Sequence, residues 1–178
     1  MSPTEPGGLA APLVEAMVVG RLDGLAFLRM LRDGALPAAP IGKTLAFHLV
    51  EVARGRVVFE GRPGPFAYNL QGTVHGGWAA AILDSAMGCA VLSMLPAGTG
   101  CTTAELSIRY VRPVRESAGV LRAEGVAVHV GRRLATAEGR LVGAADGKLY
   151  AHGATSCMIL ALDPDEIGRP VPPGDPSI

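Results

Sequence analysis

The chain has 178 residues, of which 49% are hydrophobic and 18% are charged, so it can bury a core and is not disordered by composition. Its 16 basic and 16 acidic residues give a formal net charge of zero. This balance argues against nucleic acid as a partner, because nucleic-acid binding needs a basic excess, and against a polybasic membrane anchor.

Cysteine content and hydropathy narrow the class further. The three cysteines form no C-x-x-C pair, so neither a disulfide framework nor a zinc site is expected, and the four histidines lack metal-ligand spacing. No apolar stretch reaches the roughly 18 residues of a membrane span, and the nearest one contains Asp84. The N-terminus shows no basic region followed by an apolar run. We therefore expect a cytoplasmic protein without a metal and without a membrane partner.

Composition divides the chain into three predicted parts. Residues 1–35 form an N-terminal extension that contains an amphipathic helix, and residues 36–162 form the main domain. Residues 163–178 are rich in proline and polar residues, which is typical of a flexible C-terminal tail.

The helix of the extension is predicted from about Leu9 to Leu31, because apolar residues recur there at mostly helical intervals. The Asp33-Gly34 pair should end it. After it, Pro37 and Pro40 are expected to keep the chain extended.

The main domain reads as a hairpin, one long helix and a series of strands. Residues 44–51 and 56–60 are the predicted hairpin, and the helix is expected from His75 or Gly76 to about Leu95. Four further strands are predicted at residues 102–112, 119–130, 132–143 and 149–160. This order predicts the α+β class, with an antiparallel sheet wrapped around one buried helix.

Asp84 is the only charge in the predicted long helix. A carboxylate in a buried helix is costly unless it is paired or used in chemistry, and buried carboxylates cluster at functional sites. Two interpretations therefore stay open. Asp84 is either a functional group or a structural one, bonded to Ser85 or to a backbone group of the sheet.

The entrance of this helix is a second candidate feature, because Gly76 and Gly77 occupy its first turn. Helix N-termini present unpaired N–H groups at a positive dipole end, and glycine lets a ligand oxygen come close to them. Such an entrance can bind a carbonyl oxygen that becomes an oxyanion. The alternative is a tight turn that merely requires glycine.

These residues belong to one motif, which comprises Asn69, Gly72, His75-Gly76-Gly77 and Asp84. The motif resembles that of hot-dog-fold thioesterases of the PaaI type, in which Asn precedes H-G-G by six residues and Asp follows the His by nine. The stretches at 108–113 and 146–149 are also similar. The resemblance covers roughly residues 36–162 and implies the hot-dog fold, an antiparallel β-sheet wrapped around a long central α-helix.

The resemblance also implies catalytic roles. The Gly76 N–H, helped by Asn69, would hold a thioester carbonyl, and Asp84 would act as general base on water or as nucleophile. His75 would orient the loop and the Asn69 side chain. Thr103 matches the position at which relatives place a Ser or Thr that helps to orient water.

The implied reaction is the hydrolysis of acyl-CoA thioesters, with aromatic or medium-chain acyl groups, to free acid and CoA. Coenzyme A is then part of the substrate, and no cofactor is expected. Because coenzyme A carries phosphates, basic residues are expected near the substrate. The candidate substrate-binding residues are Gly77, Arg109, Arg112, Arg132 and Arg133, and for each arginine a solvated strand end is the alternative.

Helix geometry predicts that the active site needs two chains. Gly76 and Asp84 are eight residues apart, which is about 12 Å along a helix axis. A base, one water and a bound carbonyl must lie within hydrogen-bond reach of one another. We therefore expect a homodimer whose two central helices run antiparallel, with one active site at each end of the interface. The resemblance agrees with this dimer, and many relatives pair two dimers into a tetramer, so both a dimer and a tetramer stay open.

Two other functions remain as alternatives. A hot-dog dehydratase or hydratase would use His75 with an acid to move protons at a β-carbon. A non-catalytic acyl-CoA binding module would need no base, and the presence of Asn69 and Asp84 argues against it.

Overall fold

The computed structural model describes residues 22–162. Its helices are α2 Gly24–Arg32, α3 Pro40–Thr44 and α4 Gly76–Leu92, with short 3-10 turns η1 Pro65–Ala67 and η2 Glu116–Ala118. Its strands are β1 Phe47–Ala53, β2 Arg56–Gly61, β3 Thr99–Tyr110, β4 Leu121–Val130, β5 Leu134–Gly143 and β6 Leu149–Ala161.

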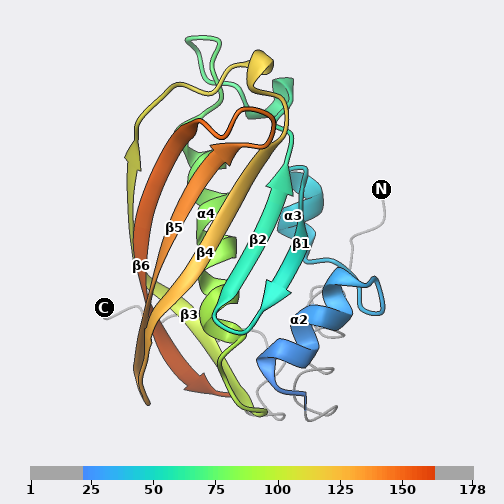
Figure 1. Ribbon diagram of the computed structural model, residues 1–178, viewed down its shortest axis with the longest axis vertical. Helices are drawn as coiled ribbons and strands as arrows, with labels where there is room; N and C mark the ends of the chain where they lie inside the picture. Colours follow the sequence, from blue (N-terminus) through green and yellow to red (C-terminus); the bar gives the residue numbers. More distant parts are fainter. Residues whose placement is uncertain (1–21, 163–178) are drawn as a thin grey trace, which may run out of the picture.

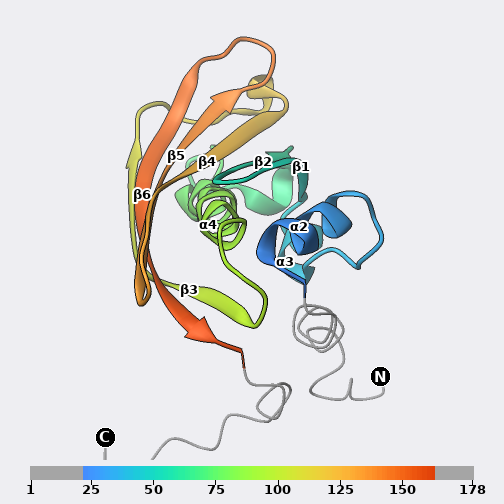
Figure 2. The same cartoon turned by 60° about the horizontal axis from the view of Figure 1, so that its bottom comes forward.

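The strands form one antiparallel sheet of six strands in the order β1-β2-β4-β5-β6-β3. The sheet curves around α4, and β3 closes the wrap at its far side (Figures 1 and 2). The predicted α+β architecture is confirmed, and so are the hairpin, the central helix and the four later strands. Since β3 is the last strand of the sheet within residues 22–162, it pairs there with β6 on one side only.

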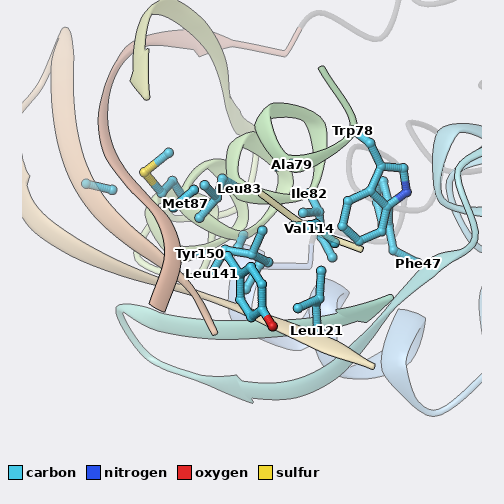
Figure 3. Close-up of a cluster of buried hydrophobic side chains, with 14 of the residues drawn as sticks. Phe47, Trp78, Ala79, Ile82, Leu83, Met87, Val114, Leu121, Leu141 and Tyr150 are labelled. Carbon is cyan, nitrogen blue, oxygen red and sulfur yellow. The ribbon is translucent and has the colours of Figure 1, made fainter. Parts of the chain in front are cut away.

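The core forms between α4 and the inner face of the sheet. Ile82, Leu83 and Met87 on the helix are completely buried, as are Leu121 and Leu141 on the strands (Figure 3). A helix that is apolar over most of its circumference must be surrounded by protein, and the curved sheet supplies that cover.

Glycine allows one strand to approach the helix backbone very closely. A Cβ atom at Gly125 on β4 would lie only 2.3 Å from the carbonyl oxygen of Ala86 on α4. A larger residue there would push the strand away from the helix and open the core between them.

The helix that was predicted to run through Leu22 and Asp23 is interrupted there. Leu22 and Asp23 are not helical, and α2 starts at Gly24 because the Asp23 side chain accepts a hydrogen bond from the Ala26 N–H at 2.8 Å. This is an N-cap, which begins a helix instead of continuing one. The end near Arg32 agrees with the prediction, while the part predicted over residues 9–21 lies outside the described residues.

The segment after Pro37 also differs from the extended chain that was predicted. Pro40 occupies the first position of α3, where its missing N–H costs nothing and its fixed φ suits a helix. As a consequence β1 begins at Phe47 and not at Thr44.

Helix α2 packs beside β1 (Figure 2) and the C-terminal part of α4. Its residues Phe27 and Leu28 are buried against Val52, Val57 and Ala90, which form a second apolar cluster. None of the helices within residues 22–162 has the length and apolar character needed to cross a membrane.

Candidate active site

The entrance of α4 leaves one backbone N–H group free. His75 precedes the helix, and its Nδ1 accepts a hydrogen bond from the Gly77 N–H at 2.9 Å. The Gly76 N–H has no hydrogen-bond acceptor among residues 22–162. Because the N-terminus of a helix is the positive end of its dipole, the Gly76 N–H can bind an oxygen that gains negative charge.

Tyr110, the last residue of β3, fixes the orientation of Gly76. Its Oη donates a hydrogen bond to the Gly76 carbonyl oxygen at 3.0 Å. A Cβ atom at Gly76 would lie 3.0 Å from Tyr110 Cζ, so glycine leaves the ring the most room at this position. No role for Tyr110 was predicted from the sequence, although it lies within the stretch 108–113 that resembles the thioesterases.

A cavity of about 390 Å³ opens beside this entrance. His75, Gly76 and Tyr110 form part of its wall. Most of its other lining residues are apolar and include Val74, Ala79, Val114, Leu141 and Ala151. The cavity can therefore hold an apolar group whose polar end faces Gly76.

Asn69 organises the loop before the helix. Its Oδ1 accepts hydrogen bonds from the N–H groups of Gln71 and Thr73, at 3.0 and 3.1 Å. Its Nδ2 donates to Thr73 Oγ1 at 2.9 Å. His75 was predicted to orient Asn69, but the structure gives its Nδ1 a different partner, the Gly77 N–H. A carbonyl-binding role for Asn69 stays a prediction.

Asp84 is half-buried on α4 and meets β3. Its Oδ1 accepts a hydrogen bond from Thr103 Oγ1 at 2.8 Å, so the structure brings these two predicted residues together. The neighbouring Ser85 donates instead to the Ala81 carbonyl oxygen at 2.9 Å and is not the structural partner of Asp84. The register of β3 against β6 shifts between Thr103 and Glu105. Such a bulge changes the direction in which side chains point.

The structure separates the predicted catalytic residues into two groups. Asn69 in the loop before α4, His75 and Gly76 form the first group. Asp84 lies eight residues after Gly76, which is about 12 Å along the helix axis. The sheet repeats this separation. Tyr110, next to Gly76, pairs with Ala151, whereas Thr103, next to Asp84, pairs with Cys157, six residues further along β6.

Three of the predicted arginines also lie at two different ends of the sheet. Arg112 lines the cavity beside Gly76, and its Nη1 donates to the Leu149 carbonyl oxygen at 2.7 Å. Arg132 and Arg133 lie in the turn before β5, and the Arg133 carbonyl oxygen accepts from the Ile159 N–H at 3.0 Å. That turn is at the Asp84 end of the sheet, away from the cavity of the same protomer.

Comparison with known proteins shows which proteins this chain resembles. Residues 71–149 match the model of the thioesterase superfamily. A phenylacetic acid degradation-related protein from Ralstonia eutropha superposes with a TM-score of 0.67 at 27% identity, over 74% of this chain and 98% of that one. A variant of the phenylacetic acid degradation protein PaaI from Thermus thermophilus gives a TM-score of 0.61 at 28% identity, over 67% of this chain and 98% of that one.

The resemblance to hot-dog-fold thioesterases of the PaaI type is thereby confirmed. A candidate esterase from Halobacterium salinarum is 41% identical over 78 residues, which are 43% of this chain and 50% of that protein. The chain thus matches half the length of this curated relative.

The cysteines of this hot-dog domain are poor nucleophiles. Burial, with a smaller contribution from the Asp84 charge, raises the pKa of the Cys89 thiol to about 12. A hydrogen bond with Cys157, together with burial, raises the pKa of Cys101. The same hydrogen bond lowers the pKa of Cys157, but that side chain is 0% exposed and out of reach of a substrate. Cysteine reactivity requires an accessible thiolate, which none of the three offers.

No group of three or more His, Cys, Asp or Glu side chains within residues 22–162 is arranged to hold a metal ion. The chemistry that the described residues offer is a backbone N–H donor and a carboxylate with a hydroxyl partner.

Proposed function

We propose that the protein hydrolyses acyl-CoA thioesters with aromatic or medium-chain acyl groups to a free acid and CoA. The observation that supports this best is the Gly76 N–H, which has no acceptor within the described part of the chain and lies on the wall of an apolar cavity. The two structural relatives are named for phenylacetic acid degradation, which favours aromatic acyl groups.

In the proposed reaction the thioester carbonyl oxygen accepts the Gly76 N–H. A water oxygen attacks the carbonyl carbon while Asp84 takes a proton from that water, and the carbonyl electron pair moves onto the oxygen. The oxyanion then re-forms the carbonyl and expels the CoA sulfur, which receives the proton from Asp84. A fixed N–H donor of this kind contributes roughly 3 kcal/mol, and a positioned base contributes about 10²–10⁴-fold in rate.

We propose that Gly76 and Asp84 of one active site come from different protomers. Their separation along α4 prevents them from acting on the same carbonyl within one chain. One face of α4 supports this arrangement, because Ala80, Ala81, Asp84 and Gly88 are among the residues of the helix that are not fully buried, and they lie at helical spacing. A second α4 that packs antiparallel against these small residues would bring its Asp84 to the Gly76 of the first.

The unpaired edge of β3 supports the same homodimer. Each of the residues 102–106 of this strand is exposed, and within residues 22–162 the strand has no partner on this side. A long edge of this kind can pair with a strand of another chain. Two β3 edges would pair beside the two α4 helices. A tetramer built from two such dimers is the larger assembly that we propose.

Thiol release from a panel of acyl-CoA esters tests the proposed activity. We expect phenylacetyl, hydroxyphenylacetyl and medium-chain aliphatic esters to release CoA, with one of these classes preferred. A dehydratase or hydratase would change a 2-enoyl-CoA without releasing thiol, and a binding module would bind esters without turnover. Either result would contradict the proposal.

Mixed dimers test the shared active site. We expect Gly76→Pro, which removes the N–H, and Asp84→Asn, which removes the base, to be nearly inactive alone. After the two variants exchange subunits at random, half of the dimers contain both chains, and each of these has one intact site. Activity should therefore recover to about a quarter of wild type, as two-fold symmetry requires. If each protomer holds a complete site, mixing restores nothing.

A further inference from the structure

Three basic side chains lie side by side on the outer face of the sheet. In the strand register, Arg109 on β3 is directly opposite His152 on β6, and His152 is directly opposite Arg140 on β5. Both arginines are exposed and His152 is half-buried. We call these three residues the basic row.

The arginines of the basic row lack the ion pairs that other arginines of the sheet form within residues 22–162. Among residues 22–162, no ion pair involves Arg109 or Arg140. Glu124 is directly opposite Arg140 on β4, but its carboxylate pairs with Arg56.

The neighbouring strands show the opposite arrangement. Arg56 pairs with Glu51 and Glu124, while Arg122 pairs with Glu51 and Glu60. Every charge in that network has a partner from the chain itself. Within residues 22–162, the two arginines of the basic row therefore differ from Arg56 and Arg122 in having no ion-pair partner, and they are available to a ligand.

The basic row lines a groove of about 440 Å³. Glu138, two residues before Arg140, is the acidic residue that lines this groove. Leu149 and Ala154 also form part of the wall of the groove. Two guanidinium groups and an imidazole around such a groove are suited to phosphate, because guanidinium matches phosphate oxygens with paired N–H donors.

The groove lies back to back with the cavity beside Gly76. Successive residues of a strand point to opposite faces, and Tyr110 lines the cavity whereas Arg109 lines the groove. On β6, Ala151 lines the cavity and His152 lines the groove. The rim between the two spaces is formed where Arg112, a cavity residue, donates to the carbonyl oxygen of Leu149, a groove residue.

We propose that the basic row binds the phosphates at the nucleotide end of the CoA ester whose thioester lies at Gly76. This inference rests on the proposed function. The flexible pantetheine arm would leave the cavity past Arg112, cross the rim at Leu149 and bring the phosphates to Arg109 and Arg140. The role is recognition of the carrier group, without contact with the reacting atoms.

The test compares acyl-CoA, its 3′-dephospho form and the matching N-acetylcysteamine thioester, which lacks the nucleotide. Arg109→Ala and Arg140→Ala should each raise KM for acyl-CoA about tenfold or more, with little change in kcat, because each removes a charge-assisted phosphate contact. The effect should shrink for the 3′-dephospho ester, which lacks one phosphate group, and vanish for the N-acetylcysteamine ester, which lacks all of them. Arg54→Ala, an exposed arginine in the β1–β2 turn, is the matched control and should leave KM unchanged.

A calorimetric titration of CoA itself separates this inference from the proposed function. One outcome is that no thioester is hydrolysed but CoA binding weakens in both arginine variants and not in Arg54→Ala. That outcome would contradict the proposed hydrolysis and support the phosphate site. Equal losses for the CoA and N-acetylcysteamine esters would overturn the site, as would unchanged CoA affinity. An effect confined to a thioester carried on an acidic carrier protein would also overturn it, because the partner would then be a protein surface.

Discussion

Asp84→Asn is expected to lower the turnover of acyl-CoA by about 10²–10⁴-fold, because the amide cannot take a proton from water. The substitution keeps the size of the side chain, and its oxygen can still accept the Thr103 hydroxyl that Asp84 Oδ1 accepts at 2.8 Å. The fold and the affinity for a CoA ester should therefore change little. Single-turnover thiol release measures the loss, while calorimetry with CoA and thermal unfolding measure binding and stability.

Ser85→Ala is the control for this experiment. Its hydroxyl is adjacent in sequence but donates to the Ala81 carbonyl oxygen, so its removal should leave turnover within a small factor of wild type. Full activity of Asp84→Asn would exclude Asp84 as the base. A parallel fall in stability and in CoA binding would assign the carboxylate a structural role instead.

Gly76→Pro is expected to lower kcat by about 10²–10³-fold, the usual loss when one oxyanion donor is removed. Proline lacks the N–H group, and Gly76 occupies the first helical position, where proline is well tolerated. His75 before it is extended, with φ of −62° and ψ of 136°, which suits a residue that precedes proline. The backbone can therefore lose one donor without losing the helix.

The matched control is Gly76→Ala, which adds the same Cβ atom but retains the N–H. That Cβ would lie 3.0 Å from Tyr110 Cζ, so the alanine variant reports the steric cost alone. We expect a clear difference in kcat between the two variants under saturating substrate. If they are equally impaired, crowding against Tyr110 explains the loss and the N–H is not the oxyanion donor.

Sequence patterns predicted the features that depend on local spacing. The central helix begins at Gly76 as expected, and the contact between Thr103 and Asp84 agrees with the motif. The start of α2 was missed because apolar residues continue the helical pattern across Leu22, whereas the Asp23 cap interrupts the backbone. A short helix at Pro40 escaped notice because proline is equally common in extended segments.

Contacts between distant segments could not be predicted in this way. Tyr110 follows the alternation of a core strand, and nothing near it in sequence shows that its hydroxyl reaches the Gly76 carbonyl. Likewise, Arg109, Arg140 and His152 become neighbours only through the pairing of three strands. The register that aligns them depends on bulges and turn lengths, which one sequence does not reveal.

The packing of α2 has a consequence for any shortened form of this protein. The Gly24 N–H donates to the Leu95 carbonyl oxygen at 3.1 Å, and Phe27 and Leu28 cover Val57 in the second apolar cluster. Truncation at residue 35, where the sequence suggests that a minimal catalytic unit starts, would uncover this surface and bring it into contact with solvent. Such a fragment would tend to self-associate, and efforts to crystallise or engineer the protein should retain the segment from Leu22 onward.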